Sequence, residues 1–306
     1  MRISFCCTGT KAAPWVEGLS AALPEANISE WQPGDPQADH AVVWSPPQQF
    51  MDEQLGLKGI FNIGAGVDAL LKLSLPPGAL VVRNEDGGMA VQMAEFVVHA
   101  ITRHVRELDR YDEDVRRGEW GFRRPRPREE FPVGIMGLGV LGTRVAQAVA
   151  HFGYPVLGWS RTAREVPGVR GYTGEGEFED FLRATHILVC LLPLTPGTRD
   201  IMNATTLLLL RHNGYVINVA RGAHLVDEDL IALVDGGHLA GAALDVFRTE
   251  PLPAGHPFWT HPKITITPHT SARTLRDEAI TQIAGKLLAL ERGEPIAGVV
   301  DRQRGY

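Results

Sequence analysis

The stretch GLGVLG, residues 137–142, constrains the possible fold more than any other feature of the chain. It directly follows the apolar run PVGIMG and opens a segment with helical spacing. In a strand–turn–helix setting each glycine has a mechanical role. Gly137 permits the tight turn, Gly139 lets the backbone approach a pyrophosphate, and Gly142 allows close packing of helix on strand. The motif therefore predicts a dinucleotide site in a parallel α/β sheet.

The residues that follow this motif indicate how the cofactor is bound. The helix expected from Val140 and Leu141 offers N–H groups and a positive dipole end to phosphates. At the end of the next strand, where an NAD enzyme usually carries an acidic residue, the chain has Ser160 and Arg161. A guanidinium and a hydroxyl bind a 2′-phosphate, whereas a carboxylate repels it. We expect NADP(H), with NAD(H) as the weaker alternative.

Short apolar runs alternate with helical segments, which predicts parallel sheets of the α/β class. The expected strands are 2–7, 40–45, 59–66 and 79–83, then 132–137, 155–160, 186–193, 215–220, 241–247 and 263–268. One long helix is expected over about 90–117, and a final amphipathic helix over about 274–292. The proline- and arginine-rich stretch after Trp120 indicates a domain boundary nearby, and we interpret 123–130 as a solvated linker.

Size and composition exclude several classes of protein. The 306 residues suffice for about two domains, and a formal net charge of −6 gives no field that attracts nucleic acid or an anionic membrane. No apolar run approaches the ~18 residues of a membrane span, and no signal peptide is visible at the N-terminus. Cys6, Cys7 and Cys190 lie in strand-like segments without metal-ligand spacing. We expect a cytoplasmic protein that binds no metal.

Three polar residues each follow a predicted strand. Arg221 comes directly after YVINVA, Glu250 shortly after GAALDVF, and His269 after KITITP. Ligands of doubly wound sheets bind beyond the carboxyl ends of the strands, on the same edge as the nucleotide. Singly, the three residues could be a loop arginine, a turn residue before Pro251 and a capping histidine. Their common position instead favours a catalytic site.

The reduction of a ketone by hydride transfer needs these three residue types. Negative charge builds on the carbonyl oxygen as the hydride arrives, so a proton donor that titrates near neutrality is required. His269 is suited to this role, and the neighbouring carboxylate of Glu250 would favour the imidazolium. The planar fork of Arg221 can bind the carboxylate of a 2-oxo acid.

Several motifs resemble those of a known family. GLGVLG, VINVARG, LDVFRTEPLP and TPHTSA are similar to the signatures of the D-isomer-specific 2-hydroxyacid dehydrogenases. LLPLTPGTRDIMN (191–203) is similar to the segment that lines their cofactor cleft. Within the family, IGAGVDALL, EDGGMAVQMAEF and the C-terminal VDRQRGY resemble the bacterial glyoxylate/hydroxypyruvate reductase A group. The resemblance spans essentially the whole chain.

This resemblance implies a Rossmann cofactor domain, residues 98–273, inserted into a flavodoxin-like substrate domain, residues 1–97 and 274–306. The implied activity is the NADPH-dependent reduction of small 2-oxo acids, glyoxylate to glycolate and hydroxypyruvate to glycerate, with His269 as the general acid. The resemblance also implies a homodimer, which agrees with the long central helix.

Roles for individual residues are implied in the same way. The catalytic trio would be Arg221, Glu250 and His269. The expected substrate-binding residues are Ala65 and Gly66 through their backbone N–H groups, Arg221, His269 and Trp44. Trp44 could equally be a partly buried core residue. The expected cofactor-binding residues are Gly137, Gly139, Val140, Leu141, Gly142, Ser160, Arg161, Leu192, Pro193, Thr198, Ala220 and, at the nicotinamide carboxamide, Asp245. Met93 stands where many relatives carry a small or β-branched residue, which leaves the substrate range open.

Two other functions are compatible with the same motifs. A non-catalytic dinucleotide sensor is an open alternative, since C-terminal-binding-protein corepressors share this fold and keep a similar trio. A dehydrogenase for a bulkier 2-hydroxy acid is the open alternative among enzymes. A formate dehydrogenase is disfavoured because those enzymes carry glutamine at the position of Glu250. A phosphoglycerate dehydrogenase is disfavoured by Arg161 and by the lack of a C-terminal regulatory domain.

Overall fold

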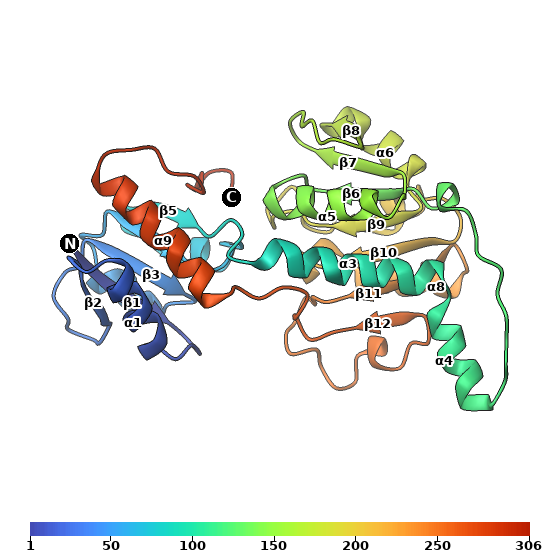
Figure 1. Ribbon diagram of the computed structural model, residues 1–306, viewed down its shortest axis with the longest axis horizontal. Helices are drawn as coiled ribbons and strands as arrows, with labels where there is room; N and C mark the ends of the chain where they lie inside the picture. The colour runs from blue at the N-terminus through green and yellow to red at the C-terminus, as the bar shows by residue number, and fades with distance from the viewer. The chain divides into compact units, whose positions relative to one another are not determined.

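The computed structural model describes residues 1–306, which divide into two compact units. Unit 1 comprises Met1–Met89 and Thr274–Tyr306, and unit 2 comprises Ala90–Arg273. Each unit is a parallel β-sheet with helices packed against it (Figure 1). The prediction of an α/β protein built on two doubly wound parallel sheets is therefore confirmed. No helix in the structure is long and apolar enough to cross a membrane.

The sheet of unit 1 has five parallel strands in the flavodoxin-like order β2-β1-β3-β4-β5. The strands are β1 (Arg2–Cys7), β2 (Asn27–Glu30), β3 (His40–Trp44), β4 (Gly59–Asn62) and β5 (Leu80–Arg83). The helices are α1 (Ala13–Ala22), α2 (Gln48–Glu53) and α9 (Arg276–Glu291). Because α1 and α9 lie side by side, Leu19 and Ile283 share one buried core with Phe5 of the sheet (Figure 1).

The sheet of unit 2 has seven parallel strands in the order β12-β11-β10-β9-β6-β7-β8. They are β6 (Val133–Met136), β7 (Val156–Ser160), β8 (Val169–Thr173), β9 (Ile187–Cys190), β10 (Gly214–Asn218), β11 (Leu239–Leu244) and β12 (Ile264–Ile266). The helices are α3 (Met89–Val105), α4 (Leu108–Arg117), α5 (Val140–His151), α6 (Phe178–Ala184), α7 (Ala204–Leu207) and α8 (Asp227–Asp235). Helices α3 and α5 share a core on one face of the sheet, and α6, α7 and α8 share a core on the other (Figure 1).

The strand order places a possible ligand site in unit 2. Strands β6, β9 and β10 are buried along their whole length, as continuous apolar runs in a parallel sheet require. The order of the strands reverses between β6 and β9, which is the switch point of this Rossmann-type sheet. The glycine-rich turn follows β6, so it lies at the switch point where such sheets bind nucleotides.

The first boundary between the units differs from the expected one. The expected boundary at 97/98 falls inside α3, and the boundary suggested near Trp120 falls inside unit 2. All of α3 except its first residue, Met89, lies in unit 2, because Met93 and Ile101 are both buried in the core that this helix shares with β6 and α5. The helix therefore belongs with unit 2 from Ala90 onward.

The expectation of one long helix over 90–117 is wrong. Helix α3 ends at Val105 and α4 begins at Leu108. Between them Glu107 has a left-handed backbone with a φ of 51°, through which a right-handed helix of L-residues does not continue. Within α4 the only buried residue is Asp114, so the apolar stripe that predicted the helix stops at this break.

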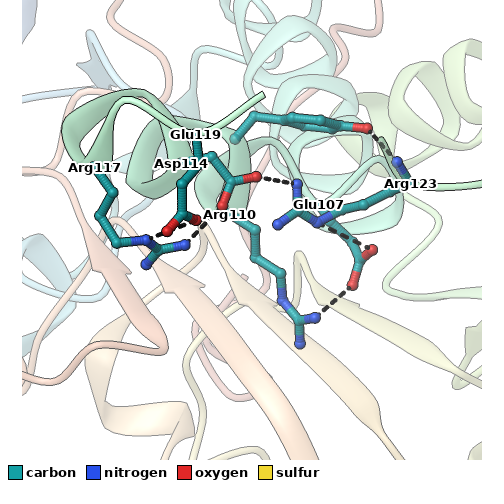
Figure 2. Close-up of polar contacts among 7 residues, drawn as sticks. Glu107, Arg110, Asp114, Arg117, Glu119 and Arg123 are labelled. Carbon is teal, nitrogen blue, oxygen red and sulfur yellow. Dashed lines mark hydrogen bonds and ion pairs between the residues drawn. The ribbon is translucent and has the colours of Figure 1, made fainter. Parts of the chain in front are cut away.

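The stretch 123–130 is exposed from residue 124 onward, as expected of a solvated linker, but its first residue is anchored to α4. Arg123 donates to Asp114, with 2.6 Å between Nη1 and Oδ2, and its guanidinium lies 4.5 Å from the centre of the Tyr111 ring. Arg117 donates to the other oxygen of the same carboxylate at 2.7 Å (Figure 2). The hydrogen bond from Arg123 lowers the pKa of the Asp114 carboxyl. These contacts hold the end of α4 against the start of the basic stretch.

Candidate active site

The turn between β6 and α5 leaves open space at only one glycine of its motif. A Cβ at Gly137, whose φ is 101°, would lie 2.8 Å from the carbonyl oxygen of Leu191. A Cβ at Gly142 would lie 1.8 Å from the carbonyl oxygen of Gly137, whereas a Cβ at Gly139 would meet no atom within 4 Å. No side chain caps α5, so the N–H groups at Val140 and beyond are available to a ligand. The turn fits the pyrophosphate of a dinucleotide.

Ser160 and Arg161 lie at the end of the neighbouring strand. β7 pairs with β6, so its end is one strand away from the glycine turn. The Ser160 hydroxyl donates to the carbonyl oxygen of Thr162 at 2.8 Å and shapes the turn, while Arg161 is exposed. Rossmann folds hold the ribose of a dinucleotide at this position.

The segment after β9 is tied to the loop after β10. Leu192 is buried, and the Thr198 hydroxyl donates to the carbonyl oxygen of Pro193 at 2.7 Å and accepts from the Thr195 N–H at 2.8 Å. Nε2 of His224 lies 3.3 Å from the same Pro193 oxygen. Thr198 therefore supports the conformation of this segment.

The turn that carries Arg221 is held by a buried asparagine. Asn218, the last residue of β10, donates from Nδ2 to the carbonyl oxygen of Arg221 at 3.0 Å and accepts the Ala220 N–H at 3.2 Å. Nη1 of Arg221 donates to the carbonyl oxygen of Ala220 at 2.7 Å. Gly222 has no room for a side chain, because a Cβ would lie 1.9 Å from the carbonyl carbon of Phe247. The loops after β10 and β11 therefore pack tightly together.

His269 and Glu250 form a direct contact. Nδ1 of His269 lies 2.7 Å from Oε2 of Glu250, and Oε1 accepts the Phe247 N–H at 2.9 Å. Since an ionised carboxylate only accepts, we assign a proton to Nδ1, which leaves the Nε2 edge of the ring for another partner. The side chains of His269 and Glu250 are 46% and 35% exposed. An accessible imidazole backed by a carboxylate is suited to proton transfer through Nε2.

Asp245 fixes the loop on which His269 stands. This carboxylate is fully buried, and Oδ1 accepts from the Thr267 hydroxyl at 2.5 Å and from the Thr270 N–H at 2.8 Å. Oδ2 accepts from the Ser271 N–H at 2.8 Å. The backbone N–H of His269 donates to the carbonyl oxygen of Asp245, also at 2.8 Å. The hydrogen bonds of the Asp245 carboxylate thus go to the His269 loop.

Arg221 stands on the loop beside the His269–Glu250 pair. The three residues follow β10, β11 and β12, which are neighbours in the sheet. The structure gives a hydrogen bond between His269 and Glu250, and it brings the Arg221 loop against the Glu250 loop at Gly222 and Phe247. The three residues therefore lie on adjoining loops at one edge of unit 2.

The substrate-binding residues expected in unit 1 lie at the carboxyl ends of β3 and β4. Trp44 ends β3 and is 36% exposed. Its ring packs closely against Gly64, where a Cβ would lie only 2.5 Å from the ring. Ala65 and Gly66 form the loop after β4. In unit 2, Met93 is buried in the core beside α5.

Several residues that support these loops were not identified from the sequence. In unit 2 two such residues are Asn218 and Arg248. Arg248 donates to the Asp200 carboxylate and to the carbonyl oxygen of Leu225, so it joins its own loop to the loops that carry these two residues. A single polar residue at the end of an otherwise apolar strand is the signal that could have found Asn218.

Comparison with known proteins shows which chains share this arrangement. The profile of the family described as "D-isomer specific 2-hydroxyacid dehydrogenase, NAD binding domain" matches residues 98–271. A protein of Yersinia enterocolitica named glyoxylate/hydroxypyruvate reductase A is 44% identical over 313 residues, covering all of both chains. A protein of the same name from Serratia proteamaculans is 45% identical over 313 residues.

Two solved structures are similar over nearly the full chain. A D-isomer specific 2-hydroxyacid dehydrogenase from Xanthobacter autotrophicus, in complex with NADPH and MES, has a TM-score of 0.94 and 37% identity, covering 100% of this chain and 99% of that one. An NADPH-dependent glyoxylate/hydroxypyruvate reductase from Sinorhizobium meliloti, in complex with NADP and sulfate, has a TM-score of 0.93 and 34% identity with the same coverage.

The glycine turn generates a paired prediction. Gly142→Ala should lower the free energy of unfolding by about 1–3 kcal/mol, because the new methyl group collides with the Gly137 carbonyl. Gly139→Ala should fold nearly normally but weaken NADPH binding roughly ten- to hundredfold, because its methyl group enters the open space where we expect the phosphates of the cofactor. Urea denaturation and fluorescence titration with NADPH measure the two effects. Unchanged NADPH affinity in Gly139→Ala would contradict the proposed position of the phosphates.

Proposed function

The chain belongs to the family of D-isomer specific 2-hydroxyacid dehydrogenases, and from this premise we propose that it reduces small 2-oxo acids with NADPH. The proposed reactions are glyoxylate to glycolate and hydroxypyruvate to glycerate. The observation that carries the proposal is the 2.7 Å contact between His269 and Glu250 at the carboxyl edge of a nucleotide-binding sheet. The names of the relatives of this chain support the choice of substrates.

The proposed chemistry uses one proton donor and one anion-binding group in unit 2. When bound, the nicotinamide supplies the hydride. His269 donates a proton from Nε2 to the carbonyl oxygen as negative charge builds there, and Glu250 stabilises the imidazolium through Nδ1. Arg221 binds the carboxylate of the 2-oxo acid through its guanidinium.

Two sets of residues are proposed to hold the cofactor and the substrate. Gly137, Gly139, Val140, Leu141 and Gly142 bind the pyrophosphate, which is supported by the open space at Gly139 and the uncapped helix. Ser160 and Arg161 bind the 2′-phosphate, and Leu192, Pro193, Thr198, Ala220 and Asp245 line the nicotinamide half. In unit 1 the substrate carboxylate is bound by the N–H groups of Ala65 and Gly66, with Trp44 beside them.

A homodimer in the cytoplasm completes the proposal. Val115, Trp120 and Phe122 are 77%, 102% and 81% exposed and lie within eight residues of one another in the chain, and exposed apolar side chains that form a patch often mark an interface. They lie in and directly after α4, which the ion pairs of Asp114 hold in place. The three cysteines form no disulfide, which supports the proposed location in a reducing compartment such as the cytoplasm.

The proposed function predicts rapid oxidation of NADPH by the purified protein when glyoxylate or hydroxypyruvate is added. The loss of reduced nicotinamide absorbance measures it across a panel of 2-oxo acids, with NADPH and NADH compared for each. Pyruvate and longer 2-oxo acids are the controls for pocket size. A protein that binds NADPH but turns over no 2-oxo acid would be a sensor, and a preference for long 2-oxo acids would indicate a dehydrogenase for bulkier substrates.

The choice of NADPH over NADH predicts a selective effect at Arg161. Arg161→Ala should lower kcat/KM for NADPH roughly ten- to hundredfold and leave NADH nearly unchanged, because only NADPH carries the 2′-phosphate. Arg183→Ala is the matched control, since Arg183 is an exposed arginine that pairs with Glu179 on α6. Equal losses with both cofactors, or a wild type that prefers NADH, would contradict the assignment.

A further inference from the structure

Two buried asparagines hold the loop of unit 1 that follows β4. Asn62 ends β4, Asn84 directly follows β5, and both side chains are almost completely buried. Nδ2 of Asn62 donates to the carbonyl oxygens of Gly64 at 2.8 Å and Gly66 at 3.0 Å. Nδ2 of Asn84 donates to the carbonyl oxygen of Ile63 at 3.2 Å. The backbone N–H of Asn84 donates to the carbonyl oxygen of Gly64 at 3.3 Å. Three carbonyl groups of one short loop are therefore fixed by two residues.

The direction of these carbonyl groups also fixes N–H groups. In a trans peptide the C=O and the following N–H lie in one plane and point in opposite directions. Because the Gly64 carbonyl is held toward Asn62 and Asn84, the N–H of Ala65 points away from them. Ala65 and Gly66 are partly exposed, and neither N–H donates to another group of the chain. The loop thus presents N–H donors that a ligand can use.

The side chain of Asn84 is buried at a cost in stability. Its Oδ1 is buried without a hydrogen-bond partner. A buried polar atom without a hydrogen-bond partner lowers the stability of the fold, and a leucine, which is of similar size and has no polar atom, would avoid this loss. The side chain also has little freedom, since a Cβ on Gly87 would come within 2.3 Å of its Nδ2. An amide kept under these conditions is best explained by what its Nδ2 holds in place.

We propose that Asn62 and Asn84 are positioning residues for the substrate carboxylate: they orient the Ala65 N–H through the Gly64 carbonyl, and Asn62 also holds the carbonyl group of Gly66. This inference rests on the proposed function, which assigns the substrate carboxylate to the N–H groups of Ala65 and Gly66. The sequence of the loop, GAG, is flexible, and ordering each residue costs about 1–2 kcal/mol of conformational entropy. The two asparagines lower that cost at the moment of binding because they order the loop beforehand.

The test compares Asn62→Leu and Asn84→Leu with the wild type. The KM for glyoxylate and the Kd of oxalate, a carboxylate that cannot be reduced, should each rise about three- to tenfold in either variant. The kcat should change little, because the lost interaction binds substrate and transition state alike. The Kd of NADPH should not change. Where a leucine variant does not fold, Asn62→Ala or Asn84→Ala removes the same donor without adding bulk.

A buried amide elsewhere in unit 1 provides the matched control. Gln54 is fully buried, its Oε1 accepts the Ala38 N–H at 2.8 Å, and its Nε2 donates to the carbonyl oxygens of Asp35 and Pro36. Gln54→Met, like the asparagine variants, removes a buried amide that holds backbone groups, yet it should leave the oxalate Kd unchanged. A purely structural role for the asparagines predicts the same oxalate Kd in all these variants.

The outcomes separate this inference from the proposed function. Asparagine variants that bind oxalate as the wild type does overturn the inference, and so does a wild type that does not bind oxalate at all. An equal loss of oxalate affinity in Gln54→Met also overturns it. A wild type that binds oxalate through Asn62 and Asn84 but does not oxidise NADPH with glyoxylate supports the positioning role and rejects the proposed reaction.

Discussion

All seven strands of unit 2 are parallel, so every loop that follows a strand leaves from the same edge of the sheet. The candidate active site depends on this common edge. The loops after β10, β11 and β12 carry Arg221, Glu250 and His269. Side-chain packing alone would not fix such loops. They are fixed by the close approach of Gly222 to Phe247 and by the three hydrogen bonds that the buried Asp245 accepts from the His269 loop. A buried carboxylate is stable only when it is hydrogen-bonded in this way.

Both units use an asparagine at the end of a strand to control the following turn. Asn218 holds the turn that carries Arg221, and Asn62, together with Asn84, holds the turn that carries Ala65. In each case the amide donates to backbone carbonyl groups, and the orientation of the peptide follows. The two sheets differ in strand order, so the shared use of asparagine does not follow from a shared topology. In both units the loop beyond a buried strand has backbone groups that need hydrogen-bond partners, and an asparagine supplies them.

Much of the fold could be predicted because its central strands are continuous apolar runs. The edge strands β2 and β8 were missed because β2 has no buried residue and β8 has one, so neither forms an apolar run. The break at Glu107 was missed because glutamate favours helices, and its left-handed backbone follows from tertiary structure. Arg221, Glu250 and His269 could be found because each follows a strand. Asn218 ends an apolar strand, a signal that could have found it, but its role and those of Asn62 and Asn84 follow from the backbone groups that they contact, which only the structure shows.

The most direct test of this account is the turnover of His269→Asn. His269 has a left-handed backbone with a φ of 54°, and asparagine tolerates that conformation well, so the variant should fold and bind NADPH normally. An amide cannot supply the proton, and the account predicts a loss of about 10²–10⁴-fold in kcat with glyoxylate, beside an unchanged Kd for NADPH. Near-normal turnover would contradict it and would leave His269 as a residue of the turn alone.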